Sequence, residues 1–299
     1  VTHRNAVWAM VACSLMWSIA GVVSRHFEAA QGFEVTFWRS AFNALALVLM
    51  LGAMRGPAAL WATVRRGGRA LWLSGLCWAT MYTAFMMALS FTTVANVLVT
   101  MAIGPLLTAL LARALLGHRL APRTWAAIAL AGCGIAWMYG HEVSAGDPRH
   151  LLGVLIALAV PVAAAVNWTL LQRLRSPRRS VDAPDMLPAV LIGAVLSALV
   201  TLPLAWPFGA TGHDVAWLAL LGVVQLAIPC LLAVTVAKVL SAPEVSLLAL
   251  LEVIFGVAWA WLGAGEAPST TVLGGGGVVL AALALHELAG MRRASPVPP

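Results

Sequence analysis

The carboxylate of Glu252 stands out because it lies near the middle of a mostly apolar run that extends from about 242 to 263. A charged side chain at the centre of a lipid bilayer costs at least about 2.5–3.5 kcal/mol, so such a group normally faces a polar interior. Two hypotheses follow from this. Either Glu252 contacts a substrate or carries a proton, or it is an uncharged structural group that is hydrogen-bonded to a neighbouring helix.

Four aromatic side chains with a polar edge also lie well inside apolar runs: Trp17, Trp78, Tyr82 and Trp168. Trp78 and Tyr82 are four residues apart, which places them on one face of a helix. Such rings suit an aromatic ligand, because they offer stacking together with a hydrogen bond. Ordinary packing between helices is the alternative for each of them.

Polar side chains occur within or at the ends of other apolar runs, at Asn96, Thr100, Asn167 and Gln225. They could bind the ammonium and carboxylate groups of a small solute, or they could only join helices, at roughly 0.6 kcal/mol each. No arginine or lysine is expected at mid-depth to bind a carboxylate, because Arg39 is expected near the outer interface. A bound carboxylate would then be held by amides, hydroxyls or a helix N-terminus.

Two prolines, Pro105 and Pro161, are predicted to break helices near mid-depth. A proline has no N–H group and its ring clashes with a carbonyl one turn earlier. The freed carbonyls could line a cavity, or the prolines could only bend their helices.

Catalytic and metal-binding patterns are missing from the sequence. It has neither HExxH nor GxSxG, and its seven histidines lie at or beyond the ends of the apolar runs. The four cysteines lie within apolar runs without CxxC spacing, so we expect no disulfide, metal or cofactor. An intramembrane enzyme and an ion channel are therefore disfavoured, whereas a scaffold or receptor that transports nothing stays open as an alternative.

The composition of the chain is that of an integral membrane protein. Hydrophobic residues make up 62% of the 299 and charged residues only 10%, whereas soluble domains carry roughly 25% charged residues. A helix crosses the hydrocarbon core with about 20 residues. Runs of that length are 6–24, 35–54, 124–140, 151–172, 186–206 and 270–289, and two longer runs, 71–116 and 215–262, must each fold back once. We therefore predict an all-α integral membrane fold with ten transmembrane helices.

The basic residues predict the orientation, because they favour cytoplasmic loops. With ten crossings and a cytoplasmic N-terminus, 15 of the 18 arginines and lysines fall on the cytoplasmic side, against Arg25, Arg39 and Arg149. This predicts a multi-pass protein of the cell (inner) membrane with both termini in the cytoplasm. It also explains the net charge of +7 without a nucleic-acid partner.

Two halves of the chain match at an offset of 148 residues. Thr93–Asn96 corresponds to Ser241–Glu244, and Leu115–His118 corresponds to Gly263–Glu266. A unit of five helices crosses the membrane an odd number of times, so its second copy must be inverted. Inverted repeats are a recurrent design of secondary transporters, in which two related halves expose one central site alternately. The pattern therefore predicts a transporter.

Several motifs resemble a known family. Leu248–Gly256 followed by Trp261–Glu266 resembles the C-terminal signature of the drug/metabolite transporter superfamily, EamA type. In the first half, Trp17, Arg39 and the pair Gly104–Pro105 agree with the same family.

The resemblance covers two five-helix repeats, residues 5–140 and 151–288, which are expected to form one structural unit. Two positions depart from the family pattern. Val253 replaces the usual proline, so the helix around it should be less kinked. His118 replaces the glutamate that usually closes the fourth helix.

Within the superfamily the chain is most similar to exporters of aromatic amino acids. This resemblance implies a central cavity lined by helices one to four and six to nine, and a substrate that is an aromatic or other neutral amino acid. Other metabolites or drugs are the alternative cargo. Transport could be coupled to protons through Glu252, or the chain could be a passive carrier.

Small residues four apart mark helices five and ten, at Ala127 and Ala131 and at Gly274 to Gly277 with Ala281. Such spacing lets helices approach closely. The close contact could lie within one chain or join two chains in a homodimer.

Overall fold

A computed structural model provides the structure of the chain and describes residues 2–117, 122–142, 148–174, 185–265, 267, 270–271, 273–278, 281–282 and 285. Every regular element in this part is helical. The elements are α1 (His3–Ser24), α2 (Gly32–Arg55), α3 (Pro57–Arg66), α4 (Arg69–Phe91), α5 (Val94–Met101), α6 (Gly104–Leu116), α7 (Pro122–Glu142), α8 (Pro148–Leu174), α9 (Pro188–Ala205), α10 (Gly212–Leu220), the π-helical turn η3 (Leu221–Ala227), α11 (Ile228–Val236), α12 (Ala242–Ala249) and α13 (Leu251–Ala264).

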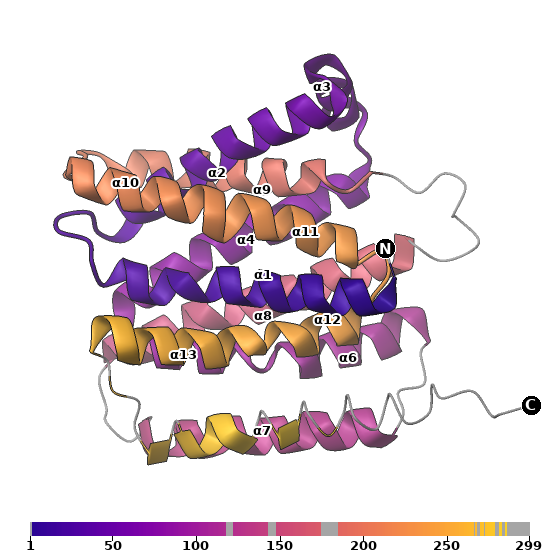
Figure 1. Cartoon of the computed structure of the whole chain (residues 1–299), viewed down its shortest axis with the longest axis vertical. Coiled ribbons are helices and arrows are strands. Elements are labelled where there is room, and N and C mark those ends of the chain that lie inside the picture. Colours follow the sequence, from indigo (N-terminus) through magenta and orange to yellow (C-terminus); the bar gives the residue numbers. More distant parts are fainter. Residues whose placement is uncertain are drawn as a thin grey trace, which may run out of the picture.

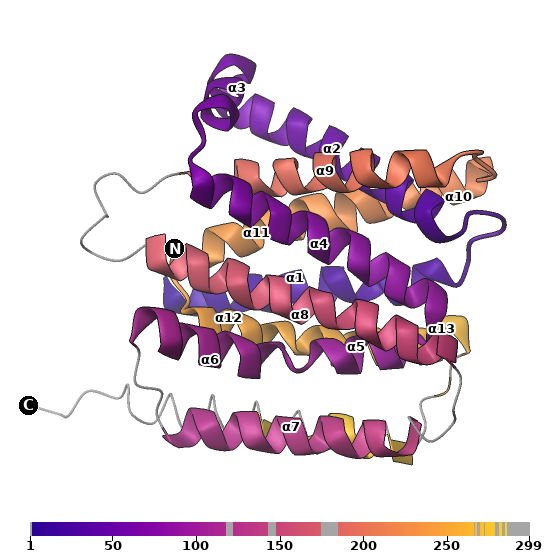
Figure 2. The same ribbon diagram turned by 180° about the vertical axis from the view of Figure 1, so that it is seen from behind.

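The long helices lie side by side as one bundle (Figure 1, Figure 2). Helix α4 packs against α8 and α9, α2 against α9 and η3, and α1 against α13 and α11. Helices from the two halves of the sequence therefore alternate in the packing. Helix α7 lies along one edge of the bundle, and α3 lies at the opposite edge.

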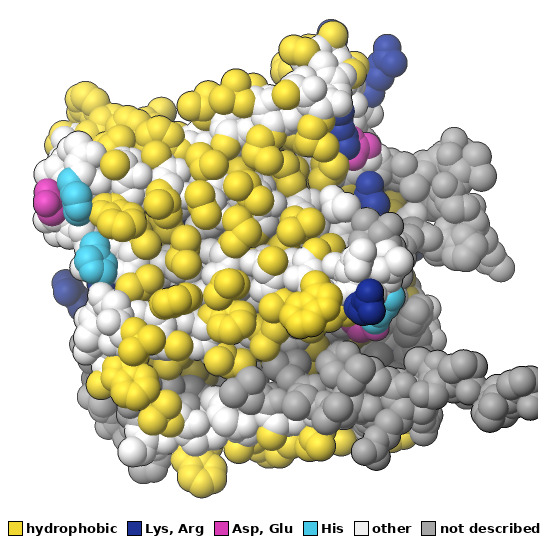
Figure 3. All heavy atoms as spheres, in the orientation of Figure 1, with side chains coloured by type: hydrophobic (Ala, Val, Ile, Leu, Met, Phe, Trp, Pro, Cys, Tyr) yellow, Lys and Arg dark blue, Asp and Glu magenta, His cyan; other side chains and the backbone are white. Residues whose placement is uncertain are grey.

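The surface fits a bilayer. Eight of the described helical segments are long and apolar enough to span a membrane. Figure 3 shows hydrophobic side chains over most of one face, with charged side chains gathered at the two opposite ends of the helices. The all-α membrane fold is thus confirmed. Helix α7 contains a shorter apolar stretch, Trp125–Gly134, and the run 270–289 falls largely outside the described residues, so the count of ten stays a prediction.

Residues that are 148 positions apart in the two halves of the chain have the same local helix geometry. Helices α5 and α12 occupy equivalent positions, and each begins after a hydroxyl that accepts a backbone N–H, Thr93 Oγ1 from Asn96 and Ser241 Oγ from Glu244. The corresponding second helices, α6 and α13, end at glycines in the left-handed region, Gly117 with φ 67° and Gly265 with φ 69°. Glycine adopts this conformation without the steric cost that other residues incur.

Both halves also interrupt the helix at the equivalent place. The first break, at Ala102 and Ile103, precedes Pro105, whose ring disfavours a regular turn. The second break lies at Leu250, and the smaller kink expected from Val253 stays a prediction. There the N–H of Leu250 bonds to the carbonyl of Leu247 in a tighter turn, and no proline is adjacent to account for it.

Pro161 does not break its helix, contrary to expectation, since α8 continues through it. Prolines are tolerated in membrane helices where neighbouring groups and local adjustments satisfy the freed carbonyl.

Small residues join α7 to the segment 273–278 within the chain. A Cβ atom added to Gly134 would lie 2.8 Å from the carbonyl oxygen of Gly275 and 3.2 Å from Val278. The close contact predicted for these helices is therefore made within one chain. A homodimer through the same helices stays a proposal.

A buried carboxylate fastens the loop between α1 and α2 to the start of α10. The side chain of Asp214 is fully buried. Its oxygens accept the backbone N–H groups of Glu28 at 2.7 Å, Ala29 at 3.0 Å, Ala30 at 2.9 Å and Thr211 at 3.2 Å. One side chain thus satisfies four backbone donors at this end of the bundle.

Asp214→Ala should lower the free energy of unfolding by about 1–3 kcal/mol, because it leaves buried N–H groups without an acceptor. The measurement is the midpoint of thermal unfolding of the purified protein in detergent. Glu28→Ala is the matched control, since the Glu28 side chain is 58% exposed in the same loop. Equal midpoints for the two variants would contradict this role of Asp214.

Candidate functional site

A cavity of about 110 Å³ lies inside the bundle where the two repeats meet. Helices α1, α2, α4 and α5 of the first half and α8, η3, α11, α12 and α13 of the second half contribute to its wall. Its lining residues are Trp17, Arg39, Trp78, Met81, Tyr82, Phe85, Met101, Val160, Ala164, Trp168, Gln225, Leu226, Cys230, Ala249 and Glu252.

All four aromatic residues singled out from the sequence line this cavity. The ring centroid of Trp78 lies 5.7 Å from that of Tyr82, with an angle of 31° between the ring planes. It also lies 5.7 Å from the ring centroid of Trp168, which meets it edge-on at an interplanar angle of 87°. Gly193 lets α9 approach α4 closely at Trp78, because a Cβ at Gly193 would come within 2.3 Å of the Trp78 Cβ. Together with Trp17, the rings form an aromatic wall with contributions from both repeats.

Arg39 lies in the interior, so its expected place near the outer interface is wrong. It is only 1% exposed. Its Nη2 donates to the carbonyl of Tyr82 at 2.7 Å, and its Nη1 donates to Oε1 of Gln225 at 3.3 Å. The guanidinium also lies 5.9 Å from the centre of the Phe85 ring, within the range of a cation–π contact.

The depth of Arg39 follows from the helix geometry. It is seven residues beyond the start of α2, or roughly 10 Å at 1.5 Å per residue. Its acceptor Tyr82 lies nine residues before the end of α4, or roughly 14 Å. Since the hydrocarbon core is about 30 Å thick, the guanidinium reaches close to the middle of the bundle.

Glu252 shares the cavity with this arginine. It is 7% exposed and lies at the second position of α13, directly after the break at Leu250. The two side chains line the same cavity, and no ion pair joins them within the described part of the chain. Removing an ion from water costs several kcal/mol unless an opposite charge and hydrogen bonds compensate. Arg39 recovers part of this cost through its hydrogen bonds to Tyr82 and Gln225.

The π-helical turn η3 places Gln225 beside Arg39. Pro229 follows one turn later, and its ring disfavours the regular helical arrangement at the carbonyl of Gln225. The amide Nε2 of Gln225 donates to the carbonyl of Trp17 at 3.2 Å. Gly222 brings η3 against α2, because a Cβ there would lie 2.8 Å from the carbonyl oxygen of Arg39. Such π-helical turns occur frequently at functional sites.

Three polar residues proposed from the sequence as ligands are not among the residues that line this cavity. The Nδ2 of Asn96 donates to Thr92 Oγ1 at 2.9 Å, and the hydroxyl of Thr100 donates to the carbonyl of Asn96 at 2.7 Å. Asn167 Oδ1 accepts the Ser74 hydroxyl at 2.6 Å and so joins α8 to α4. These contacts match the alternative in which such groups connect or cap helices.

Three buried donors of the cavity wall have no hydrogen-bond partner within the described part of the chain. They are Nε of Arg39, Nε1 of Trp78 and the hydroxyl of Tyr82. A buried donor without an acceptor costs about 1–3 kcal/mol. Their presence among the lining residues is therefore a reason to look for a ligand here.

The profile of the EamA-like transporter family matches residues 4–140 and 151–286, most of the chain. The chain belongs to the EamA-like transporter family. Among curated proteins none matches it. Twenty-eight chains of solved structures match. One, described as "Crystal structure of protein", has a TM-score of 0.72 and 19% sequence identity, and the alignment covers 98% of this chain and 100% of that chain. This likeness shows the shared fold.

As an EamA-like transporter, the chain is a multi-pass membrane protein that carries small molecules. Both matched segments contribute to the cavity: the first supplies Trp17, Arg39 and Trp78, and the second supplies Trp168 and Glu252. The cavity is therefore a shared feature of the two repeats of this EamA-like protein.

Because the basic Arg39 and the acidic Glu252 line one cavity, we predict that their substitutions have non-additive effects on stability. Arg39→Gln and Glu252→Gln should each destabilise the transporter, because each leaves one buried charge unmatched. The double variant should be more stable than the sum of the single effects predicts, by about 0.5–3 kcal/mol. Thermal unfolding of the four proteins in detergent measures this, and additive effects would show that the two groups are independent.

Proposed function

We propose that this transporter exports aromatic or other neutral amino acids by alternating access through the cavity between its repeats. The observation that carries the proposal is one aromatic-walled cavity holding a buried cation, Arg39, and a buried carboxyl, Glu252. The resemblance to exporters of aromatic amino acids supports the same substrate class.

The two charges are complementary to a zwitterion. A guanidinium binds a carboxylate through parallel hydrogen bonds, and such charge-assisted bonds are roughly twice as strong as neutral ones. Arg39 can therefore bind the α-carboxylate, which replaces the amide-based binding expected from the sequence. Glu252 can accept the α-ammonium group. Trp17, Trp78 and Trp168 would then surround the side chain of the amino acid.

Export of other metabolites or drugs is the second candidate function. Met81 and Met101 line the same cavity, and methionine side chains adapt their shape to different partners. A panel of substrates that includes aromatic amino acids and apolar cations distinguishes the two.

Binding requires the cavity to widen. Its volume of about 110 Å³ is well below the roughly 300–1,000 Å³ of typical ligand pockets. The breaks at Ala102–Ile103 and Leu250 supply two places where short helices can pivot, since tighter turns within helices often mark hinges. These equivalent breaks support a movement that is related between the repeats.

Reconstituted protein should transport phenylalanine, tyrosine or tryptophan into or out of liposomes. Trp17→Leu should raise the KM for these amino acids by about 10-fold, because stacking on the Trp17 ring is lost. Trp8→Leu is the matched control, because Trp8 lies on the same helix and is 68% exposed. Radiolabelled flux measures both. Flux of small hydrophilic solutes without any of the three aromatic amino acids would contradict the proposed substrate class.

The orientation in the cell membrane is part of the proposal, with both termini in the cytoplasm. Figure 3 supports it, because most of the arginine and lysine side chains on the face shown lie at the end that carries the N-terminus in Figure 1. Basic residues favour the cytoplasmic side.

An impermeant maleimide applied to intact cells should label Gln31→Cys but not Ala58→Cys until the membrane is permeabilised. Both positions are exposed, one in the loop before α2 and the other in α3 after it. The background should lack Cys133, which is exposed on α7. The reverse labelling would overturn the orientation.

A further inference from the structure

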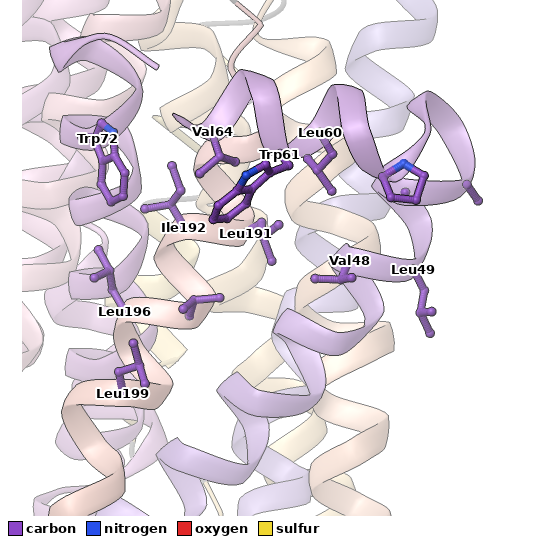
Figure 4. A pocket seen from close by; sticks show the side chains of 14 residues that line it. Val48, Leu49, Leu60, Trp61, Val64, Trp72, Leu191, Ile192, Leu196 and Leu199 are labelled. Carbon is purple, nitrogen blue, oxygen red and sulfur yellow. The ribbon is translucent and has the colours of Figure 1, made fainter. Parts of the chain in front are cut away.

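An apolar groove lies on the outer surface of the bundle, away from the central cavity. Its volume is about 870 Å³, and helices α2, α3, α4 and α9 form its walls. We call it the α3 groove and define it by Leu49, Trp61, Trp72, Leu191, Val195 and Leu199. Figure 4 shows Trp61 beside Leu191 and Ile192, with Trp72 on the far side of Ile192.

Small residues on α2 and the tilt of α3 leave this space open. Gly52 and Ala53 lie on the α2 side of the groove. A Cβ atom added to Gly52 would meet no atom within 4 Å. The tryptophan rings of the rim remain accessible, with Trp61 66% and Trp72 46% exposed. The walls are apolar throughout, so only a hydrocarbon chain or another apolar surface can fill the groove favourably.

Three arginines lie close in the sequence to the two tryptophans of the groove. Helix α3 finishes with Arg65 and Arg66, and Arg65 lies one helical turn beyond Trp61 on the same face. Arg69 begins α4 three residues before Trp72. All three arginines are exposed. The neighbouring Arg55 is already engaged in an ion pair with Asp185.

We propose that the α3 groove binds one anionic phospholipid, with an acyl chain along the apolar walls and the phosphate beside Arg65, Arg66 and Arg69. Each basic residue near an anionic membrane surface contributes about 1 kcal/mol, and arginine matches a phosphate through paired donors. Tryptophan side chains are enriched at the level of the lipid headgroups, so Trp61 and Trp72 suit the headgroup end of this site.

A second copy of the chain fits this surface poorly. A twofold contact places the same patch of both subunits together. The three arginines of one copy would then approach those of the other, and like charges would repel. A lipid with a negative headgroup complements the same patch.

The test compares two lipids with identical chains. Dioleoylphosphatidylglycerol and dioleoylphosphatidylcholine are added to the purified protein in detergent, and native mass spectrometry measures the lipid that stays bound. The anionic lipid should bind more tightly. Arg65→Gln, Arg66→Gln and Arg69→Gln combined should weaken its binding by roughly 100-fold, which corresponds to about 1 kcal/mol per arginine, and should leave the weaker binding of phosphatidylcholine unchanged.

Gly52→Leu tests the acyl-chain part of the site. The new side chain has free space, and leucine is a better helix former than glycine, so the variant should fold while the groove is filled. Binding of phosphatidylglycerol should fall at least 10-fold. Gly132→Leu is the matched control, since it enters open space on α7. Equal binding of both lipids, binding that survives Gly52→Leu, or a dimer that Gly52→Leu dissociates would each overturn the proposal.

Discussion

A guanidinium inside a bundle of membrane helices must find both hydrogen-bond acceptors and a compensating charge, because desolvation of an ion costs several kcal/mol. Arg39 takes its acceptors from two other elements, the carbonyl of Tyr82 on α4 and the amide oxygen of Gln225 on η3, and it shares its cavity with the carboxyl of Glu252 on α13. Helices α2, α4, η3 and α13 must therefore converge on one point. Gly222 permits this convergence by letting η3 touch the backbone of α2.

The repeat explains how one point can be reached from both halves of the chain. Arg39 and Tyr82 belong to the first half, and Gln225 and Glu252 to the second. The break at Leu250 lies two residues before Glu252, and the equivalent break at Ala102–Ile103 follows Met101 of the cavity wall. Residues next to such breaks are freer to reorient than residues within a regular helix. The electrostatic centre is thus adjacent to the places where the repeats can move.

Much of this arrangement could be predicted from the sequence, because it depends on patterns along a single helix. The apolar runs predicted the membrane helices, and the depth of Trp17, Trp78, Tyr82 and Trp168 within those runs predicted their place in the cavity. The offset between Thr93 and Ser241 predicted the equivalent caps.

The position of Arg39 could not be predicted in the same way. The rule that basic residues lie in loops assigns an arginine near a helix start to the interface. Its burial depends on acceptors from Tyr82 and Gln225, which are 43 and 186 residues away. Gln225 is recognisable in the sequence as a polar residue within an apolar run, but the π-helical turn that presents it to Arg39 has no sequence pattern of its own. Asn96 and Asn167 show the opposite case. A polar residue within an apolar run can form its hydrogen bonds within the protein as readily as with a ligand, and the sequence does not distinguish the two.

The presence of Arg39 and Glu252 in one cavity also restricts which cargo the proposed site favours. An anion that binds to Arg39 alone would neutralise the positive charge near Glu252. A cation that binds to Glu252 alone would neutralise the negative charge near Arg39. Each case leaves one buried charge less well matched, which is costly in a medium of low dielectric constant. A zwitterion can match both groups at once and adds no net charge to the interior. The charge arrangement therefore favours neutral amino acids over simple anions or cations, and the aromatic wall favours those with large apolar side chains.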